Sequence, residues 1–127
     1  MGRRIFMNIQ QIMICDIEDL AQWSLREYFT PIPEDVSIET IEGIQKISQM
    51  MVYYTNQYSF LASVLSYLKF YTRKSKQEKD GKSDELIDKK EIIQKALDTV
   101  KQKQSALSRM ITIRQEINKE LEYTKVM

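Results

Sequence analysis

The chain has 127 residues, of which 43% are hydrophobic and 29% charged, and its formal net charge is +1. These values are typical of about one globular domain, argue against a disordered chain, and favour no partner by global charge. It contains only three Gly and two Pro, too few for a sandwich or barrel that turns about every 8–12 residues. We therefore expect an all-α protein in which residues 1–127 form a single helical domain.

The sequence contains few of the residue types and motifs on which enzymes usually depend. Histidine is absent, which removes Ser–His and Cys–His pairs, most zinc sites and the commonest general base. The glycines stand apart, so no phosphate-binding loop is present. The single cysteine, Cys15, lies in an apolar run and is expected to be a small buried thiol in a reducing, cytoplasmic setting. We expect no enzyme activity, no metal site and no cofactor.

The N-terminal part reads as a short amphipathic helical segment over residues 8–29. Apolar residues recur there at helical i, i+3 and i+4 spacing: Ile9, Ile12, Met13, Ile17 and Leu20. Pro31 and Pro33 should end it, because a proline disfavours helix in the residue before it. Met7 is an alternative start of the natural protein, and the short apolar stretch after Arg4 does not read as a signal peptide.

A long helix is expected over residues 37–76, with Ser37 as its N-cap and acidic residues such as Glu34 and Asp35 near its positive end. A heptad seam runs along it: Ile44, Ile47, Met51, Tyr54, Tyr58, Leu61, Leu65 and Leu68. Residues 47–68 carry no charge, but eight hydrogen-bonding side chains surround this stretch. We therefore reject a membrane span.

A polar linker over residues 77–84, with its turn at Asp80-Gly81, should lead into a second long helix over residues 85–123. Its seam has sevenfold spacing: Leu86, Ile93, Val100, Leu107 and Leu121. The two helices should form a long antiparallel, coiled-coil-like hairpin with a short N-terminal helix packed on it. Arg114 interrupts the second seam, where it either fixes register or oligomeric state, or extends to the edge with its stem packed.

The long helix carries a second apolar stripe about 110° around from the seam. Its residues are Met50, Tyr53, Phe60, Val64, Tyr67 and Tyr71. The first five of these are candidate interface positions, and Arg114 of the second long helix is a sixth. Because a hairpin supplies only one neighbour, the stripe needs another. Either the N-terminal helix covers it through Ile12, Leu20 and Trp23, or a second copy does, and we favour a homo-oligomer.

Aromatic and basic residues alternate where the long helix ends. Aromatic faces stack on unpaired bases while cations follow phosphates, so seven residues are candidate nucleic-acid contacts: Lys69, Tyr71, Arg73, Lys74, Lys76, Lys101 and Arg109. Lys89 and Lys90 are expected to add charge opposite Arg73. The alternative is that the tyrosines pack and the lysines only solvate the helix.

Several segments together resemble the UvsY family of tailed-phage recombination mediators. They are residues 35–39 (Asp-Val-Ser-Ile-Glu), a Tyr-rich helix with a basic end, a Gly-containing linker, Asp88-Lys89, and residues 96–101 (Ala-Leu-Asp-Thr-Val-Lys). The likeness covers about residues 35–121. It implies a small helical protein that assembles into a ring and helps to load a recombinase onto single-stranded DNA.

Three classes of function stay open, since a helical hairpin hosts many functions. The first is an oligomeric accessory factor of recombination that binds single-stranded nucleic acid. The second is a protein-only adaptor, or an inhibitor of a host enzyme or defence system, similar in kind to an anti-CRISPR protein. The third is a structural or assembly component.

Overall fold

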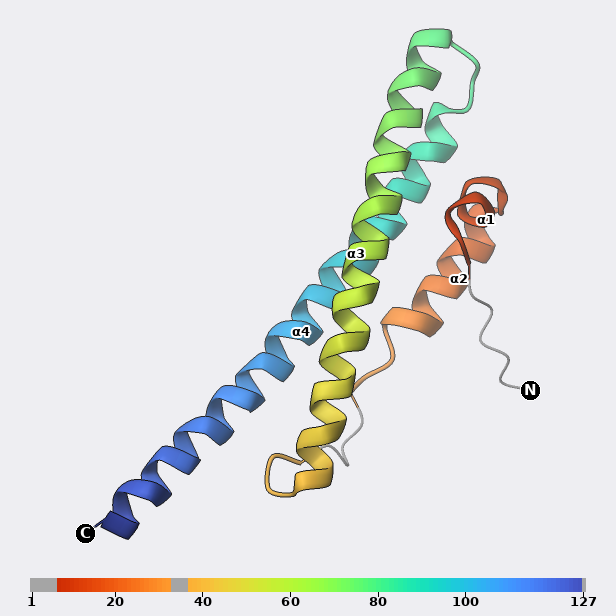
Figure 1. Ribbon diagram of the computed structural model, residues 1–127. Helices are drawn as coiled ribbons and strands as arrows, with labels where there is room; N and C mark the ends of the chain where they lie inside the picture. The colour runs from red at the N-terminus through yellow and green to blue at the C-terminus, as the bar shows by residue number, and fades with distance from the viewer. Residues whose placement is uncertain (1–6, 33–36, 127) are drawn as a thin grey trace. The chain divides into compact units, whose positions relative to one another are not determined.

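The computed structural model describes residues 7–32 and 37–126, with the backbone alone for residues 123–126. All its regular elements are helices: α1 (Ile9–Ile14), α2 (Ile17–Tyr28), α3 (Ile41–Glu78) and α4 (Ser83–Val126). The two long helices pack against each other as a hairpin (Figure 1), which confirms the predicted all-α hairpin. Within the described ranges, no helix has both the length and the apolar character needed to cross a membrane.

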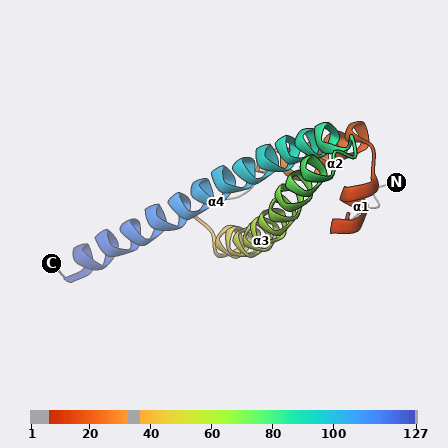
Figure 2. The same ribbon diagram turned by 90° about the horizontal axis from the view of Figure 1, so that it is seen from above.

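The contacts of the chain gather in two units. Unit 1 comprises the described residues of Met1–Thr30 and Tyr58–Thr99, so it holds α1, α2 and the sections of α3 and α4 on either side of the turn. Unit 2 comprises those of Pro31–Gln57 and Val100–Met127. Figure 2 shows α1 and α2 beside the green and cyan sections of the hairpin that belong to unit 1.

The predicted N-terminal helical segment over residues 8–29 consists of two helices, α1 and α2, where a single short helix was expected. Cys15 and Asp16 both adopt extended backbone conformations, with ψ angles of 161° and 151°. Asn8 and Gln11 close the start of α1 as a capping box, each side chain accepting a hydrogen bond from the other's backbone N–H. The apolar spacing continues across the break, which is why the pattern did not reveal it.

The core of unit 1 draws on all four helices. Its buried apolar side chains are Ile12, Leu20, Trp23, Tyr28, Leu61, Val64, Leu65, Leu68, Ile93, Ala96 and Leu97. Trp23 meets Tyr28 edge to face, with ring centroids 5.4 Å apart. The N-terminal helices therefore pack on the hairpin, as predicted.

The turn between the long helices spans residues 79–82, shorter than the predicted linker of residues 77–84. Lys79 is left-handed (φ 55°), and the N–H of Asp80 donates to the carbonyl of Ser75 at 3.4 Å. This 6→1 bond is that of a Schellman C-cap. The Asp80 carboxylate also accepts from the Ser75 hydroxyl and from the N–H of Lys82, and these bonds, the first above all, lower the pKa of Asp80.

In unit 2, α3 begins at Ile41, four residues after the predicted start. Its cap is Thr40, whose hydroxyl accepts from the N–H of Gly43 at 2.9 Å. The predicted cap, Ser37, instead accepts from the N–H of Glu39 in the preceding bend. A Cβ at Gly43 would collide with the carbonyl of Ser37, so this close approach requires glycine. Residues 1–6 and 33–36, on which the alternative start and the acidic helix end depend, lie outside the described residues.

Burial along α4 fades within unit 2. Val100 and Leu107 are fully buried, and α3 contributes Ile47 and Tyr54 to the same core. Further along, Ile113, Ile117 and Leu121 are 41%, 36% and 55% exposed. The last part of the predicted seam therefore has an uncovered apolar side.

Replacing Lys79 with glycine should stabilise the hairpin by about 0.5–1 kcal/mol. A side chain in the left-handed region costs roughly 1–2 kcal/mol, and the extra freedom of glycine in the unfolded chain offsets part of that gain. Urea unfolding measures the change. As a control, Lys69→Gly places glycine at a solvent-exposed position in the middle of the same helix. It should lower the free energy of unfolding by about 1 kcal/mol. A Lys79→Gly protein less stable than the native one would contradict this account of the turn.

Candidate nucleic-acid interface

Three aromatic rings form a cluster on α3 in unit 1. Tyr67 and Tyr71 lie one turn apart, with ring centroids separated by 5.5 Å and ring planes inclined by 33°. Phe70 meets Tyr71 edge to face at 5.3 Å. Tyr67 remains 48% exposed and Phe70 59% exposed, while Tyr71 is half-buried. The contacts hold the rings together and leave much of their surface open to solvent.

The opposite side of α3 fixes the direction in which this cluster points. Leu61, Leu65 and Leu68 are buried there, and so are two polar residues, Thr72 and Ser75. The Thr72 hydroxyl donates to the carbonyl of Leu68 at 2.6 Å, and the Ser75 hydroxyl donates to Asp80. Since both hydroxyls are satisfied, this side can pack against the unit without an unpaired polar group.

Four cations border the aromatic cluster, and all are exposed: Lys69, Arg73, Lys74 and Lys76. At 100° per residue, Lys74 falls between Phe70 and Tyr67, and the other three span an arc of about 60° beyond Phe70. We call this set the α3 surface: Tyr67, Lys69, Phe70, Tyr71, Arg73, Lys74 and Lys76. It contains five of the seven predicted nucleic-acid contacts, and sequence reasoning left Phe70 out of that set.

The other two predicted contacts, Lys101 and Arg109, belong to unit 2. Both are exposed. Arg109 lines an open hollow of about 520 Å³ together with Met51, Gln104 and three hydroxyl side chains of α4. The predicted polar side of the last helix therefore belongs to unit 2, whereas the α3 surface belongs to unit 1.

Lys89 does not join the exposed cations, contrary to expectation. Its side chain is 1% exposed, and its ammonium donates to the carbonyls of Ile12 and Met13 at 2.9 and 2.8 Å. Glu85, one turn earlier on α4, lies 3.6 Å away. The two carbonyls belong to the last turn of α1, where backbone acceptors lack partners within the helix and a cation is favoured. Lys89 thus fixes α1 against α4, through partners more than seventy residues away that no local pattern indicates.

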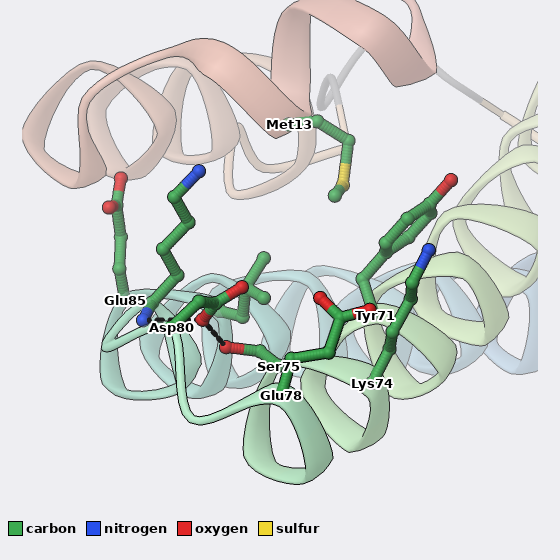
Figure 3. Close-up of a pocket in the computed structure, with 9 residues that line it drawn as sticks. Met13, Tyr71, Lys74, Ser75, Glu78, Asp80 and Glu85 are labelled. Atoms are coloured by element: carbon green, nitrogen blue, oxygen red, sulfur yellow. Dashed lines mark hydrogen bonds between the residues drawn. The ribbon is translucent and has the colours of Figure 1, made fainter.

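Two hollows meet where α1 faces α3, and Met13 and Tyr71 line both. The larger, about 440 Å³, is completed by Ile9, Gln10, Ile14 and Tyr67. The other, about 320 Å³, extends past Lys74 toward the turn and is lined there by acidic residues, including Glu78 and Glu85. Figure 3 shows Met13 pointing from the N-terminal helices into this second hollow, with Tyr71 and Lys74 on its other side.

The predicted interface residues have different environments. Val64 is fully buried in unit 1, so it has no surface left for a second copy. Met50, Tyr53 and Phe60 are half-buried, whereas Tyr67 is part of the α3 surface. Ile12, Leu20 and Trp23 are buried in the same unit as Val64, which favours cover by the N-terminal helices.

Arg114 interrupts the seam in unit 2, as predicted. Its side chain is half-buried, and its Nε is buried with no hydrogen-bond partner among the described residues. A buried donor without an acceptor is unfavourable, so the Nε of Arg114 lacks the partner that its burial requires.

Cys15 is half-buried, less covered than the sequence indicated. Its Sγ donates to the carbonyl of Ile12 at 3.4 Å. Burial above all raises the pKa of the thiol, and the opposing effect of nearby Lys89 is smaller. A raised pKa keeps the thiol protonated near neutral pH, which is the reverse of what activates a cysteine nucleophile.

Within the described ranges, no group of three His, Cys, Asp or Glu side chains is placed to hold a metal ion. Comparison of the chain with protein-family models, curated proteins and solved structures gives no match. By its fold the chain is an all-α helical-hairpin protein. The α3 surface is its candidate site for binding nucleic acid.

Replacing Lys89 with methionine should destabilise the protein by about 1.5–3 kcal/mol. Methionine keeps most of the apolar stem but leaves the carbonyls of Ile12 and Met13 without their donor. Urea unfolding followed by the fluorescence of Trp23 measures the loss. Lys95→Met, at an exposed position of α4, should stay within about 0.5 kcal/mol of the native protein. Equal stability of the two variants would show that Lys89 does not hold α1.

Proposed function

We propose that this chain is a non-enzymatic binding protein whose α3 surface engages single-stranded nucleic acid. One observation carries the proposal: Tyr67 and Phe70 are about half exposed beside four exposed cations, although α3 buries its opposite side well. A helix that used these rings only for packing would leave less of them in water. Rings beside cations match the way in which single-strand binders combine stacking with phosphate contacts.

A preference for single strands follows from the chemistry of this surface. Base faces are available for stacking only when the bases are unpaired, and duplex DNA hides them. Every base has such a face, so the rings give little sequence preference. The cations give binding that weakens with salt, since phosphate contacts release counterions.

The likeness to UvsY-type mediators extends the proposal to a role as an accessory factor in recombination. Mediators of that type load a recombinase onto single-stranded DNA, for which a strand-binding surface and assembly into an oligomer are both required. The α3 surface would supply the first requirement.

Removing two charges with Arg73→Ala and Lys74→Ala should weaken binding to a fluorescein-labelled oligothymidylate. The slope of log affinity against log salt should fall by up to about 1.4, at roughly 0.7 per phosphate contact on a single strand. Fluorescence anisotropy over a salt series measures this slope. A variant with Lys95→Ala and Lys119→Ala loses the same charge at exposed positions outside the α3 surface and should keep the native slope.

Absence of binding at low salt would remove the nucleic-acid proposal and favour the protein-only adaptor or inhibitor. Equal slopes in the two double variants would show that strand binding, if present, uses another surface.

For the oligomer, we propose that a second copy of the chain covers the end of α4. Ile113, Ile117 and Leu121 are exposed at fourfold spacing on one side of the helix. This stripe continues the heptad seam that packs α4 against α3, so a helix of the same spacing fits it. The unpaired Nε of Arg114 beside it favours a partner that brings an acceptor.

Ile117→Asp combined with Leu121→Asp should shift the protein to the monomer, because the added carboxylates would be buried at the interface. Sedimentation equilibrium over a range of concentrations measures the mass. Thr112→Asp with Gln115→Asp adds the same charge to exposed positions of α4 outside the stripe and should preserve the oligomer. A native protein that is monomeric at every concentration would refute self-association.

A further inference from the structure

We infer that the larger hollow between α1 and α3 accepts one unstacked base of a bound single strand. This inference rests on the proposed function and adds a subsite to it. The hollow is open and has a volume of about 440 Å³, within the range of roughly 300–1,000 Å³ typical of small-molecule sites. Its lining comes from two elements far apart in the sequence, α1 and the aromatic end of α3.

The lining has the chemistry of a base site. Tyr67 and Tyr71 supply two rings with centroids 5.5 Å apart and planes inclined by 33°, so one side of the hollow is aromatic. Met13 supplies a polarisable thioether from α1, and such groups pack well against aromatic rings. Gln10 adds an amide with both a donor and an acceptor, as hydrogen bonding to a base edge requires.

Charge distinguishes a nucleotide from an apolar peptide side chain as the occupant. Lys74 lies on the same face of α3 as Tyr67 and Tyr71, and it lines the adjoining hollow that shares Met13 and Tyr71. An ammonium in this position is placed for the phosphate next to an inserted base. Glu78 and Glu85 lie toward the turn, so the strand should leave past Lys69 and Arg73 instead, where the exposed charge is positive.

Insertion of one base would fix the position of the strand along the α3 surface. Exposed rings and cations alone do not fix that position. The two hydrogen bonds from Lys89 to the carbonyls of Ile12 and Met13 help to hold the wall from α1 in place. Lys89 is therefore a positioning residue for the hollow, while the phosphate contacts of the α3 surface do not depend on it. A duplex offers no free base and should not use the hollow.

The test compares two fluorescein-labelled strands of equal length in anisotropy titrations. One is an oligothymidylate, and the other is an abasic strand with the same phosphates and no bases. Met13→Trp fills the hollow while keeping the backbone carbonyl that Lys89 needs. Gln22→Trp places the same ring at an exposed position of α2 outside the hollow, as the matched control. Ile14→Trp, at a lining residue that is 82% exposed, serves if Met13→Trp lowers the melting temperature.

The native protein should bind the oligothymidylate more tightly than the abasic strand. Met13→Trp or Ile14→Trp should reduce affinity for the oligothymidylate by about fivefold to a hundredfold, the range for loss of one stacked base. Affinity for the abasic strand should stay unchanged, and Gln22→Trp should behave as native. The Lys89→Met protein, if folded, should show the same loss of affinity for the oligothymidylate and the same unchanged affinity for the abasic strand.

Equal binding of both strands by the native protein, or no effect of filling the hollow, would overturn the base site and leave phosphate binding by the α3 surface intact. Binding of duplex as tightly as single strand would overturn it too. If neither strand binds at low salt, the proposed function itself fails.

Discussion

The buried ammonium of Lys89 is the contact on which the arrangement of unit 1 depends. A buried charge is tolerated only when it is paired or fully hydrogen-bonded, and here two carbonyls and the nearby Glu85 meet that condition. The carbonyls are accessible because the helix stops at Ile14, so the break between α1 and α2 and the burial of Lys89 belong together. With α1 held in this way, Met13 comes to face Tyr71, and the hollow beside the α3 surface acquires its second wall.

A single helix, α3, combines a structural side with the candidate binding side. Its buried side in unit 1 includes two hydroxyl residues, and their hydrogen bonds to the Leu68 carbonyl and to Asp80 make that burial acceptable. Asp80 in turn orders the turn, so the packed side of α3 and the end of the hairpin are linked. The consequence is that the aromatic rings and cations of the α3 surface are displayed on a rigid helix. A site on a rigid element binds at lower entropic cost than one on a loop that must first be ordered.

The heptad seams predicted the hairpin, because their spacing follows from helix geometry alone and tolerates errors of a few residues at each end. Helix ends were less well predicted. Ser37 and Thr40 are both good caps, and the structure uses Thr40, while the backbone at Ser37 lies close against Gly43 in the first turn of α3. The break at Cys15 and Asp16 was invisible, since the apolar spacing on its two sides is continuous.

The sequence by itself determined the helical class, the two long seams, the turn near Gly81 and the basic, aromatic end of α3. Each of these is a local property of spacing or residue type. Only the tertiary structure decided which side chains remain in water. Val64 and Lys89 are buried while Tyr67 and Phe70 are not, and Arg73 and Lys101 belong to different units. These outcomes depend on which helix covers which face. For Lys89 they also depend on partners more than seventy residues away in the sequence. The spacing of residues within one segment therefore cannot predict them.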